Sequence, residues 1–294
     1  MNIAFIISDY NYQGGGQVTA NLAEHLQSLG YTVDIIVIRC REGDAKSRPN
    51  HFLNILDLHA SGLFSSVFKL TKIFRNSRYD ACISIGANSN LFAGLAKFLS
   101  RSSTPVIGSE HFATSVLIGD YPKIFLRLSL PLFRFAYTKL NGLIFVSDKL
   151  RLEFLKKNSW HPSRCVRIYN PIRSPEKKPK ENVKSKVDVL VLTSDSEAFG
   201  MVLVEGLAAG LQVVSTDSFS GPSEVLGDGR YGFLAEVNDV NSIASSMKAA
   251  IDSPISQKII HEGASRFSID SIVKKYLEFI TIVIASDGNL DDSI

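Results

Sequence analysis

The stretch SDSEAFGMVLVEGLAAGLQVV, residues 194–214, holds the features that decide the fold. An apolar run at 187–192 precedes it and predicts a buried strand, and residues 201–209 predict a helix that ends at Gly210. A second apolar run at 212–215 predicts another strand. A strand, a loop, a helix and a strand in this order indicate a parallel βαβ unit, in which ligands bind beyond the carboxyl ends of the strands.

Two glutamates in this stretch, Glu197 and Glu205, are separated by seven residues. Glu197 falls in the predicted loop, and Gly200 begins the predicted helix, whose first N–H groups are unpaired and suit an anion. Glu205 falls one turn into that helix, where its carboxylate could accept two hydroxyl hydrogen bonds from a ribose. The plain alternative is that one glutamate caps the helix and the other is solvated.

The same alternation of short apolar runs and helical periodicity extends over the rest of the chain. Strands are predicted at residues 2–8, 32–38, 81–85, 106–108, 142–146 and 165–169, and helices at 17–29, 91–99, 121–139, 148–158, 240–251, 254–265 and 269–285. Strands separated by helices predict an α/β, doubly wound and Rossmann-like fold.

Charge divides the 294-residue chain into two parts. Residues 1–172 carry 20 Lys and Arg against 11 Asp and Glu, whereas residues 173–294 carry 12 against 18. Residues 173–187 are rich in Lys and Pro, which predicts an exposed basic linker between two domains. We therefore predict domains at 1–172 and 188–285 and a polar tail at 286–294. The net charge of +3 does not indicate nucleic-acid binding.

The beginning of the sequence and its three cysteines point to a reducing compartment. Met1–Asp9 lacks the basic start and long apolar core of a secretory leader, and the cysteines lack metal-site or disulfide spacing. No uncharged stretch reaches the roughly 18 apolar residues that a membrane span needs. We expect a cytoplasmic location.

Three consecutive glycines, Gly14, Gly15 and Gly16, follow the first predicted strand and open the first helix. Glycines at such a place let backbone N–H groups approach a phosphate, and the helix N-terminus favours an anion. The run fits neither the G-x-G-x-x-G pattern nor the P-loop, and a plain turn is the alternative.

The two spaced glutamates, with Phe199 and Gly200 between them and GLAAGLQVV after them, resemble the signature of a large glycosyltransferase family. This is the retaining GT-B family of the group 1 or family 4 type, which includes bacterial lipopolysaccharide, capsule and glycolipid enzymes. Further segments that resemble the family lie at 14–24, 29–33, 107–111, 145–148, 169–172, 220–226 and 229–234. The resemblance covers residues 1–172 and 188–285 and implies two Rossmann-like lobes.

The resemblance implies a nucleotide-sugar donor bound to the C-terminal lobe. Glu197 would contact the hydroxyls of the transferred sugar. Phe199, Gly200 and Met201 would present backbone amides to the sugar-phosphate, and Glu205 would hold the ribose. The acceptor would be a saccharide or a lipid-linked saccharide.

The N-terminal lobe has implied roles as well. Gly15 and Gly16 would lie against the donor diphosphate, and His111 would lie near the transferred sugar on the acceptor side. Retention in the family is ascribed to same-face attack, in which the leaving phosphate helps to remove the acceptor proton, so no protein nucleophile is needed. No Asp-x-Asp pair is present, so we expect no metal and no cofactor beyond the nucleotide-sugar substrate.

The sequence departs from the family after Ile172. In the family the second lobe begins with a longer segment whose Arg and Lys clamp the donor diphosphate, but here residues 173–187 take its place. We therefore expect a truncated C-terminal lobe with weak donor binding, and a strand at 187–192 that is exposed or paired with a partner chain. The alternative function is that of an inactive shortened glycosyltransferase acting as a binding or partner module.

Residues 121–139 combine four cations with many large apolar side chains. A cationic amphipathic helix of this kind can lie on an anionic membrane surface, and a buried helix with snorkelling cations is the alternative. The positive charge of residues 1–172 favours the membrane surface or a lipid-linked acceptor, and a peripheral location at the inner face of a membrane.

Overall fold

The computed structural model describes residues 1–9, 14–39, 53–76, 79–111, 123–158, 160–173 and 188–287. The chain forms two compact units. Unit 1 contains Met1–Phe145, Lys157–Val166 and Val273–Ile294, and unit 2 contains Val146–Lys156 and Arg167–Ile272. This division differs from the predicted boundary at residue 172. The predicted linker lies outside the described residues except for its first residue.

Two helices account for the difference in boundaries. Nearly all of α6 (Asp148–Lys157) belongs to unit 2, because the Glu224 carboxylate accepts a hydrogen bond of 2.8 Å from the first N–H of that helix. Most of α11 (Ile269–Asp287) belongs to unit 1. There the Phe279 ring lies so close to Gly142 that a Cβ on the glycine would be 2.7 Å from the ring. Residues 288–294 of the predicted tail lie outside the described residues.

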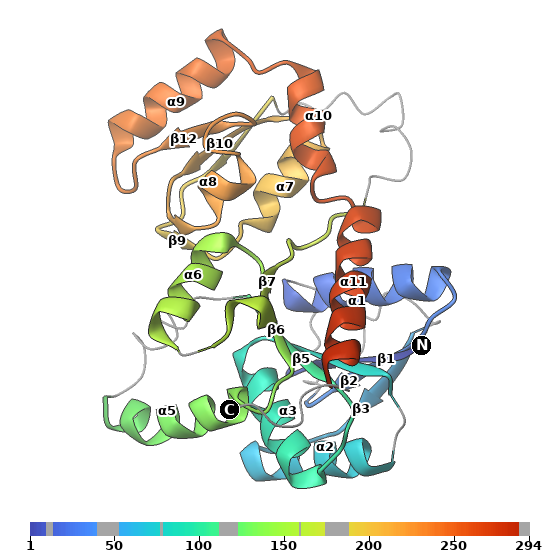
Figure 1. Cartoon of the computed structure of the whole chain (residues 1–294). Coiled ribbons are helices and arrows are strands. Elements are labelled where there is room, and N and C mark those ends of the chain that lie inside the picture. The colour runs from blue at the N-terminus through green and yellow to red at the C-terminus, as the bar shows by residue number, and fades with distance from the viewer. Residues whose placement is uncertain are drawn as a thin grey trace. The chain divides into compact units, whose positions relative to one another are not determined.

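Unit 1 is built on a seven-stranded sheet in the order β3-β2-β1-β4-β5-β6-β7, and the pairs from β3 to β6 are parallel. The strands are β1 (Asn2–Ile7), β2 (Thr32–Val37), β3 (Asn54–Asp57), β4 (Ala81–Ile85), β5 (Val106–Glu110), β6 (Gly142–Phe145) and β7 (Cys165–Arg167). The helices of this part are α1 (Gly15–Ser28), α2 (Leu63–Asn76), α3 (Ala87–Ser100) and α5 (Lys123–Tyr137), with a short 3-10 turn, η2 (Pro162–Arg164). Figure 1 shows α1 on one face of the sheet and α2 and α3 on the other.

The central strands of this sheet are the apolar runs of the sequence. All five residues of β4 and of β5 are buried, as a parallel strand covered on both faces requires. The predicted strands and helices of residues 1–172 are therefore confirmed, with ends that shift by a few residues. The strand β3, the helix α2 and the short turn η2 of this part are absent from the sequence-based prediction.

Unit 2 holds a three-stranded parallel sheet in the order β12-β10-β8, made of β8 (Val189–Leu192), β10 (Gln212–Thr216) and β12 (Phe233–Ala235). A separate two-stranded sheet pairs β9 (Ser196–Glu197) in parallel with β11 (Phe219–Ser220). The helices are α7 (Met201–Ala208), α8 (Pro222–Val225), α9 (Val240–Asp252) and α10 (Gln257–Ser265). The predicted strand, loop, helix and strand of residues 187–215 are thus present.

The sheet of unit 2 ends at β8. Within the described residues β8 pairs with β10 alone, and all four of its residues are only half-buried. A fully apolar strand with one paired neighbour is what a shortened Rossmann-like sheet is expected to leave at its edge. None of the helices in the described ranges has the length and apolar character to cross a bilayer.

Candidate functional site

In unit 1 the candidate residues lie at the carboxyl edge of the sheet. The strands β1, β4 and β5 are neighbours in that order, so the loops that follow them share one edge. The glycine run follows β1, Gly86 follows β4 and His111 follows β5. Chain order reverses between β1 and β4, because β1 leads to β2 on one side and β4 leads to β5 on the other. Such a switch point is where open α/β sheets bind ligands.

The glycine run forms the beginning of α1. Gly14 is the N-cap and has a φ of 53°, a left-handed value that glycine adopts without strain. Gly15 is half-buried and Gly16 is buried, and the first turn carries no acidic side chain. Within the described residues, no side chain caps the start of this helix and no carboxylate lies in its first turn, which suits the predicted phosphate contact.

His111 is buried at the end of β5. Its Nε2 lies 3.0 Å from the Ser109 hydroxyl. Burial lowers the pKa of His111 to about 4, because a charged imidazolium is poorly solvated there. At neutral pH the side chain is therefore a neutral imidazole that can donate or accept a hydrogen bond.

Directly before His111, the carboxyl group of Glu110 is buried in a polar network that the sequence did not reveal. Asn90 Nδ2 donates a hydrogen bond of 2.7 Å to Glu110 Oε1, and the Tyr137 hydroxyl donates to the same oxygen. Ser84 Oγ donates to Asn90 Oδ1 at 2.6 Å. Burial raises the pKa of Glu110 to about 7, against the smaller opposite effect of these hydrogen bonds.

In unit 2 the loop after β8 fixes the Glu197 carboxylate. Ser194 Oγ donates a hydrogen bond of 2.8 Å to Glu197 Oε1. The buried hydroxyl of Thr216 in turn donates a 2.6 Å hydrogen bond to the Ser194 carbonyl. The pairing of β9 with β11 places Glu197 opposite Ser220. The three-residue spacing of Ser194 and Glu197 is the sequence signal that could have identified Ser194.

The segment after Glu197 turns sharply into α7. Phe199 is buried, and its ring centroid lies 5.6 Å from those of Tyr169 and Phe267. A Cβ on Gly221 would come within 2.6 Å of the Phe199 backbone, so the two loops touch.

The N-cap of α7 is Gly200, with a φ of 83°. Met201 begins the helix, and Glu205 is exposed one turn later. The predicted start of the helix is therefore confirmed, while the donor contacts of these residues stay predictions. Among the described residues no cluster of three or more His, Cys, Asp or Glu side chains could hold a metal.

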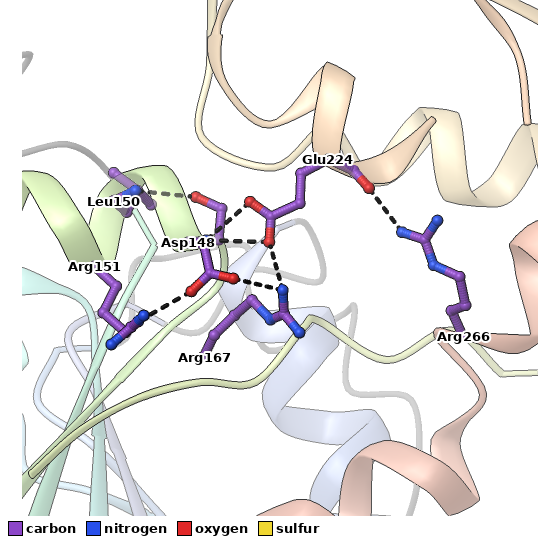
Figure 2. A network of polar contacts seen from close by, with 7 residues as sticks. Asp148, Leu150, Arg151, Arg167, Glu224 and Arg266 are labelled. Carbon is purple, nitrogen blue, oxygen red and sulfur yellow. Dashed lines mark hydrogen bonds and ion pairs between the residues drawn. The ribbon is translucent and has the colours of Figure 1, made fainter. Parts of the chain in front are cut away.

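An ion-pair network in unit 2 joins α6 to the segment around Glu224 (Figure 2). Asp148 pairs with Arg167 at 2.6 Å and with Arg151 at 3.0 Å, and the Glu224 carboxylate lies 3.3 Å from Arg167. Arg266 donates a 2.7 Å hydrogen bond to the Glu224 carbonyl. Arg167 is thereby engaged by two carboxylates, so the network holds α6 in place.

The Glu197 loop and its neighbours in the sequence carry no positive charge of their own. Residues 188–229 contain neither Lys nor Arg. Of the later cations in the described part of unit 2, Arg230 pairs with Glu262 at 2.7 Å and Lys248 pairs with Asp252 at 2.6 Å. The basic residues at 174–187 lie outside the described ranges. The cations that reach the segment beside the loop are Lys149, whose Nζ lies 2.9 Å from Ser223 Oγ, and Arg266, which donates to the Glu224 carbonyl.

Comparison with known proteins gives two family matches. The profile of Glycosyltransferase Family 4 matches residues 12–174, and that of Glycosyl transferases group 1 matches residues 171–267. Together the two profiles span both candidate regions.

Curated relatives match over shorter stretches. An exopolysaccharide phosphotransferase of Streptomyces coelicolor is 35% identical over 106 residues, which are 34% of this chain and 11% of that protein. The lipopolysaccharide core biosynthesis glycosyltransferase LpsE of Rhizobium meliloti is 30% identical over 99 residues, 32% of this chain and 29% of LpsE. An N-acetylgalactosaminyltransferase of Campylobacter jejuni, whose name specifies a diphospho-undecaprenol substrate, is 37% identical over 68 residues, 23% of this chain and 19% of the relative. The chain matches less than a third of the length of these relatives.

Solved structures share the fold over nearly the whole chain. The Anabaena protein HepE, in complex with UDP-glucose, superposes with a TM-score of 0.75 and 14% sequence identity, covering 96% of this chain and 100% of that chain. A sequence identity of 14% shows the shared GT-B fold alone, so the ligands of this chain must be argued from its own residues.

Proposed function

The chain belongs to Glycosyltransferase Family 4, and from that premise we propose that it transfers a sugar from a nucleotide-sugar donor to a saccharide or lipid-linked acceptor, with retention of configuration. The proposed setting is polysaccharide or lipopolysaccharide biosynthesis, which the names of the relatives from Streptomyces and Rhizobium support. The transferred unit would be a hexose or hexosamine.

The single observation that carries the proposal is the loop between β8 and α7. A hydroxyl holds Glu197 in place, the rings of Tyr169 and Phe267 pack against Phe199, and α7 begins at Met201 without a side-chain cap. We propose that Glu197 binds the hydroxyls of the transferred sugar and that the amides of 199–201 bind the sugar-phosphate. Glu205, exposed one turn further on, would hold the ribose.

Residues of unit 1 complete the proposal. Gly15 and Gly16 would face the donor diphosphate with the N–H groups of α1. His111, neutral at pH 7 because burial lowers its pKa to about 4, would hydrogen-bond the sugar or the acceptor. Proton removal from the acceptor would fall to the leaving phosphate, and the proposal needs neither a protein nucleophile nor a metal.

A second function is favoured by the missing positive charge. Two charge-assisted hydrogen bonds are worth about 1.5–3 kcal/mol each. Their loss weakens donor binding by about a hundredfold to ten-thousandfold. The absence of Lys and Arg from residues 188–229 therefore supports the alternative of an inactive shortened glycosyltransferase that binds ligands or a partner chain. The half-buried edge strand β8 is where such a partner chain would pair.

Calorimetry and a turnover assay distinguish the two functions. UDP- and GDP-sugars are titrated into the purified chain, and nucleotide release is followed with a saccharide acceptor. Weak binding with measurable turnover that Glu197→Gln abolishes supports the transferase, whereas no turnover with any donor supports the partner module. A metal chelator is expected to leave the turnover unchanged.

Location belongs to the same proposal. A lipid-linked acceptor is held at a membrane, so we propose a cytoplasmic protein that associates peripherally with the inner face of an anionic membrane. The acceptor named for the Campylobacter relative supports this choice.

A further inference from the structure

Side chains at the carboxyl end of β5 alternate between two buried polar environments. Ser109 and His111 are two residues apart, and the Ser109 hydroxyl lies 3.0 Å from His111 Nε2. Glu110, between them, leaves the strand on the opposite face, where it accepts from Asn90 and Tyr137. The side-chain hydrogen bonds of His111 and of Glu110 are therefore separate, although the two residues are adjacent in the sequence.

The hydroxyl of Tyr276 on α11 is a second polar group beside Ser109. The buried side of α11 places Phe279 and Val283 against Gly142 of β6, the strand that pairs with β5. Tyr276 is 1% exposed, and among the described residues its hydroxyl makes no hydrogen bond of regular geometry. Burial raises the pKa of Tyr276 to about 12, and hydrogen bonding by Ser109 has a smaller, opposite effect. Ser109 is thus the side chain that faces this buried hydroxyl.

One direction of hydrogen bonding gives a partner to each hydrogen in this row of three side chains. A buried tyrosine O–H needs an acceptor, and a serine hydroxyl can accept from one neighbour while it donates to another. If Tyr276 donates to Ser109, the hydroxyl hydrogen of Ser109 is directed to His111 Nε2. The reverse direction would leave the Tyr276 hydrogen without an acceptor. Donation to Ser109 from both sides would leave the Ser109 hydrogen without one, and either defect costs free energy.

We propose that Tyr276 and Ser109 are positioning residues, which hold His111 in the tautomer with its hydrogen on Nδ1. A neutral imidazole carries one N–H, so a hydrogen bond accepted at Nε2 places that hydrogen on the other ring nitrogen. His111 then acts toward a ligand as a hydrogen-bond donor, and it favours an oxygen with a lone pair, such as a sugar hydroxyl or ring oxygen. This use of Nδ1–H rests on the proposed sugar transfer, whereas the tautomer does not.

Nitrogen NMR of the full chain with isotope-labelled histidine tests the tautomer at neutral pH, in the absence of nucleotide-sugar. A ring nitrogen without a hydrogen resonates far downfield of one that carries a hydrogen, so the spectrum identifies the tautomer directly. The resonances of His111 are those lost in His111→Gln. We expect the hydrogen on Nδ1 of His111 and none on Nε2.

Variants of the two positioning residues test its cause. Ser109→Ala removes the donor to Nε2, and Tyr276→Phe removes the hydroxyl that directs this donor. Both are expected to shift the His111 equilibrium toward hydrogen on Nε2, and Ser109→Thr, which keeps the hydroxyl, should retain the Nδ1 form. Tyr137→Phe is the matched control, because it removes another buried hydroxyl from a helix, but one that bonds Glu110. It should leave the tautomer unchanged, and circular dichroism melts verify that each variant folds.

Turnover with a saccharide acceptor is a separate readout. Ser109→Ala and Tyr276→Phe are expected to lower kcat by about threefold to tenfold, the value of one neutral hydrogen bond, with KM for the donor nearly unchanged. Absence of turnover in the unmodified chain would count against sugar transfer alone, since the NMR spectrum is recorded without it.

Two NMR results would overturn the proposal. The first is a hydrogen on Nε2 of His111 in the unmodified chain, which needs no variant to fold. The second is a His111 tautomer that stays the same in both Ser109→Ala and Tyr276→Phe.

Discussion

The carboxylate of Glu197 is held by a hydroxyl three residues earlier in the chain. The Ser194 hydroxyl contributes the 2.8 Å hydrogen bond, and Thr216 fixes the backbone of Ser194 from β10. The sugar contact proposed for Glu197 therefore depends on a residue that itself touches no substrate. Ser194 is a positioning residue in this arrangement.

Removing that hydroxyl separates its effect from a structural one. Ser194→Ala is expected to lower kcat by about tenfold to a hundredfold, since a hydrogen bond to a charged group is worth about 1.5–3 kcal/mol. KM for the donor changes little, because the amides of α7 and Glu205 are retained. Steady-state kinetics measure the split, and Ser194→Thr, which keeps the hydroxyl, should restore most of kcat. An equal loss in both variants would contradict the positioning role.

Glu110 links the pH dependence of stability to a buried network. Its pKa is about 7 in the folded chain and about 4.5 when unfolded. Between these values the folded state keeps a proton that the unfolded state has released. Stability therefore falls as pH rises through this window, by about 3 kcal/mol for a shift of this size. The neighbouring His111 has the opposite slope, because its pKa of about 4 lies below the usual 6.5.

Glu110→Gln removes the contribution to the free energy of unfolding that decreases as pH rises. The contribution of His111 is retained. Relative to the unmodified chain, the free energy of unfolding of the variant is expected to rise by up to about 3 kcal/mol between pH 4 and pH 8. Urea unfolding at several pH values measures this difference. A difference that stays constant over the range would show that Glu110 has the same pKa in the folded and the unfolded chain.

The sequence predicted those site residues whose structural partners are close to them in the chain. The loop from Ser194 to Glu205 was predicted because a strand, a glycine and a helix follow one another locally. The network of Glu110 was not predicted, because its partners Asn90 and Tyr137 are 20 and 27 residues away on different helices. Only the fold brings these side chains together.

At the scale of elements, the contact between α3 and α5 depends on a missing side chain. A Cβ on Gly94 would overlap the Ala136 carbonyl oxygen and would lie 2.8 Å from its carbon. The glycine therefore lets the two helices approach closely. Helix propensity alone would favour Ala at this position by about 1 kcal/mol.

Gly94→Ala is expected to destabilise unit 1 by about 1–3 kcal/mol, because the helices must separate. Gly15→Ala is the matched control. Its Cβ would meet Ile85 at an ordinary 3.5 Å. Thermal melts and urea titrations compare the two variants. Equal stability of both would show that α5 can shift without cost.

Two of the elements that the sequence did not reveal, α2 and β3, have polar or exposed side chains where a pattern needs apolar ones. The buried side of α2 includes Ser66 and Thr71, while Phe64 and Phe68 are exposed, so its apolar stripe is blurred. The edge strand β3 has four residues, of which only Ile55 and Leu56 are apolar. The formation of α2 and of β3 therefore depends on contacts with the rest of the fold rather than on a local apolar pattern.

At the scale of the whole molecule, we expect donor binding to depend on unit 2 and turnover to depend on unit 1 as well. His111 belongs to unit 1, and Glu205 belongs to unit 2. Glu205→Ala is expected to weaken nucleotide-sugar binding by about tenfold, since two hydroxyl contacts are lost. His111→Ala leaves donor affinity nearly unchanged and lowers turnover. Calorimetry and turnover assays of both variants measure the split, and loss of donor binding in His111→Ala would contradict it.

The chain passes between its two units four times, after residues 145, 156, 166 and 272. All seven strands of the first sheet are made within the first 167 residues, yet Phe279, which packs against Gly142, comes more than a hundred residues later. During translation the sheet therefore emerges from the ribosome before α11, and its surface at β6 stays uncovered until residues 269–287 have been synthesised. A chaperone that shields this surface until α11 is made is therefore expected to raise the yield of folded protein.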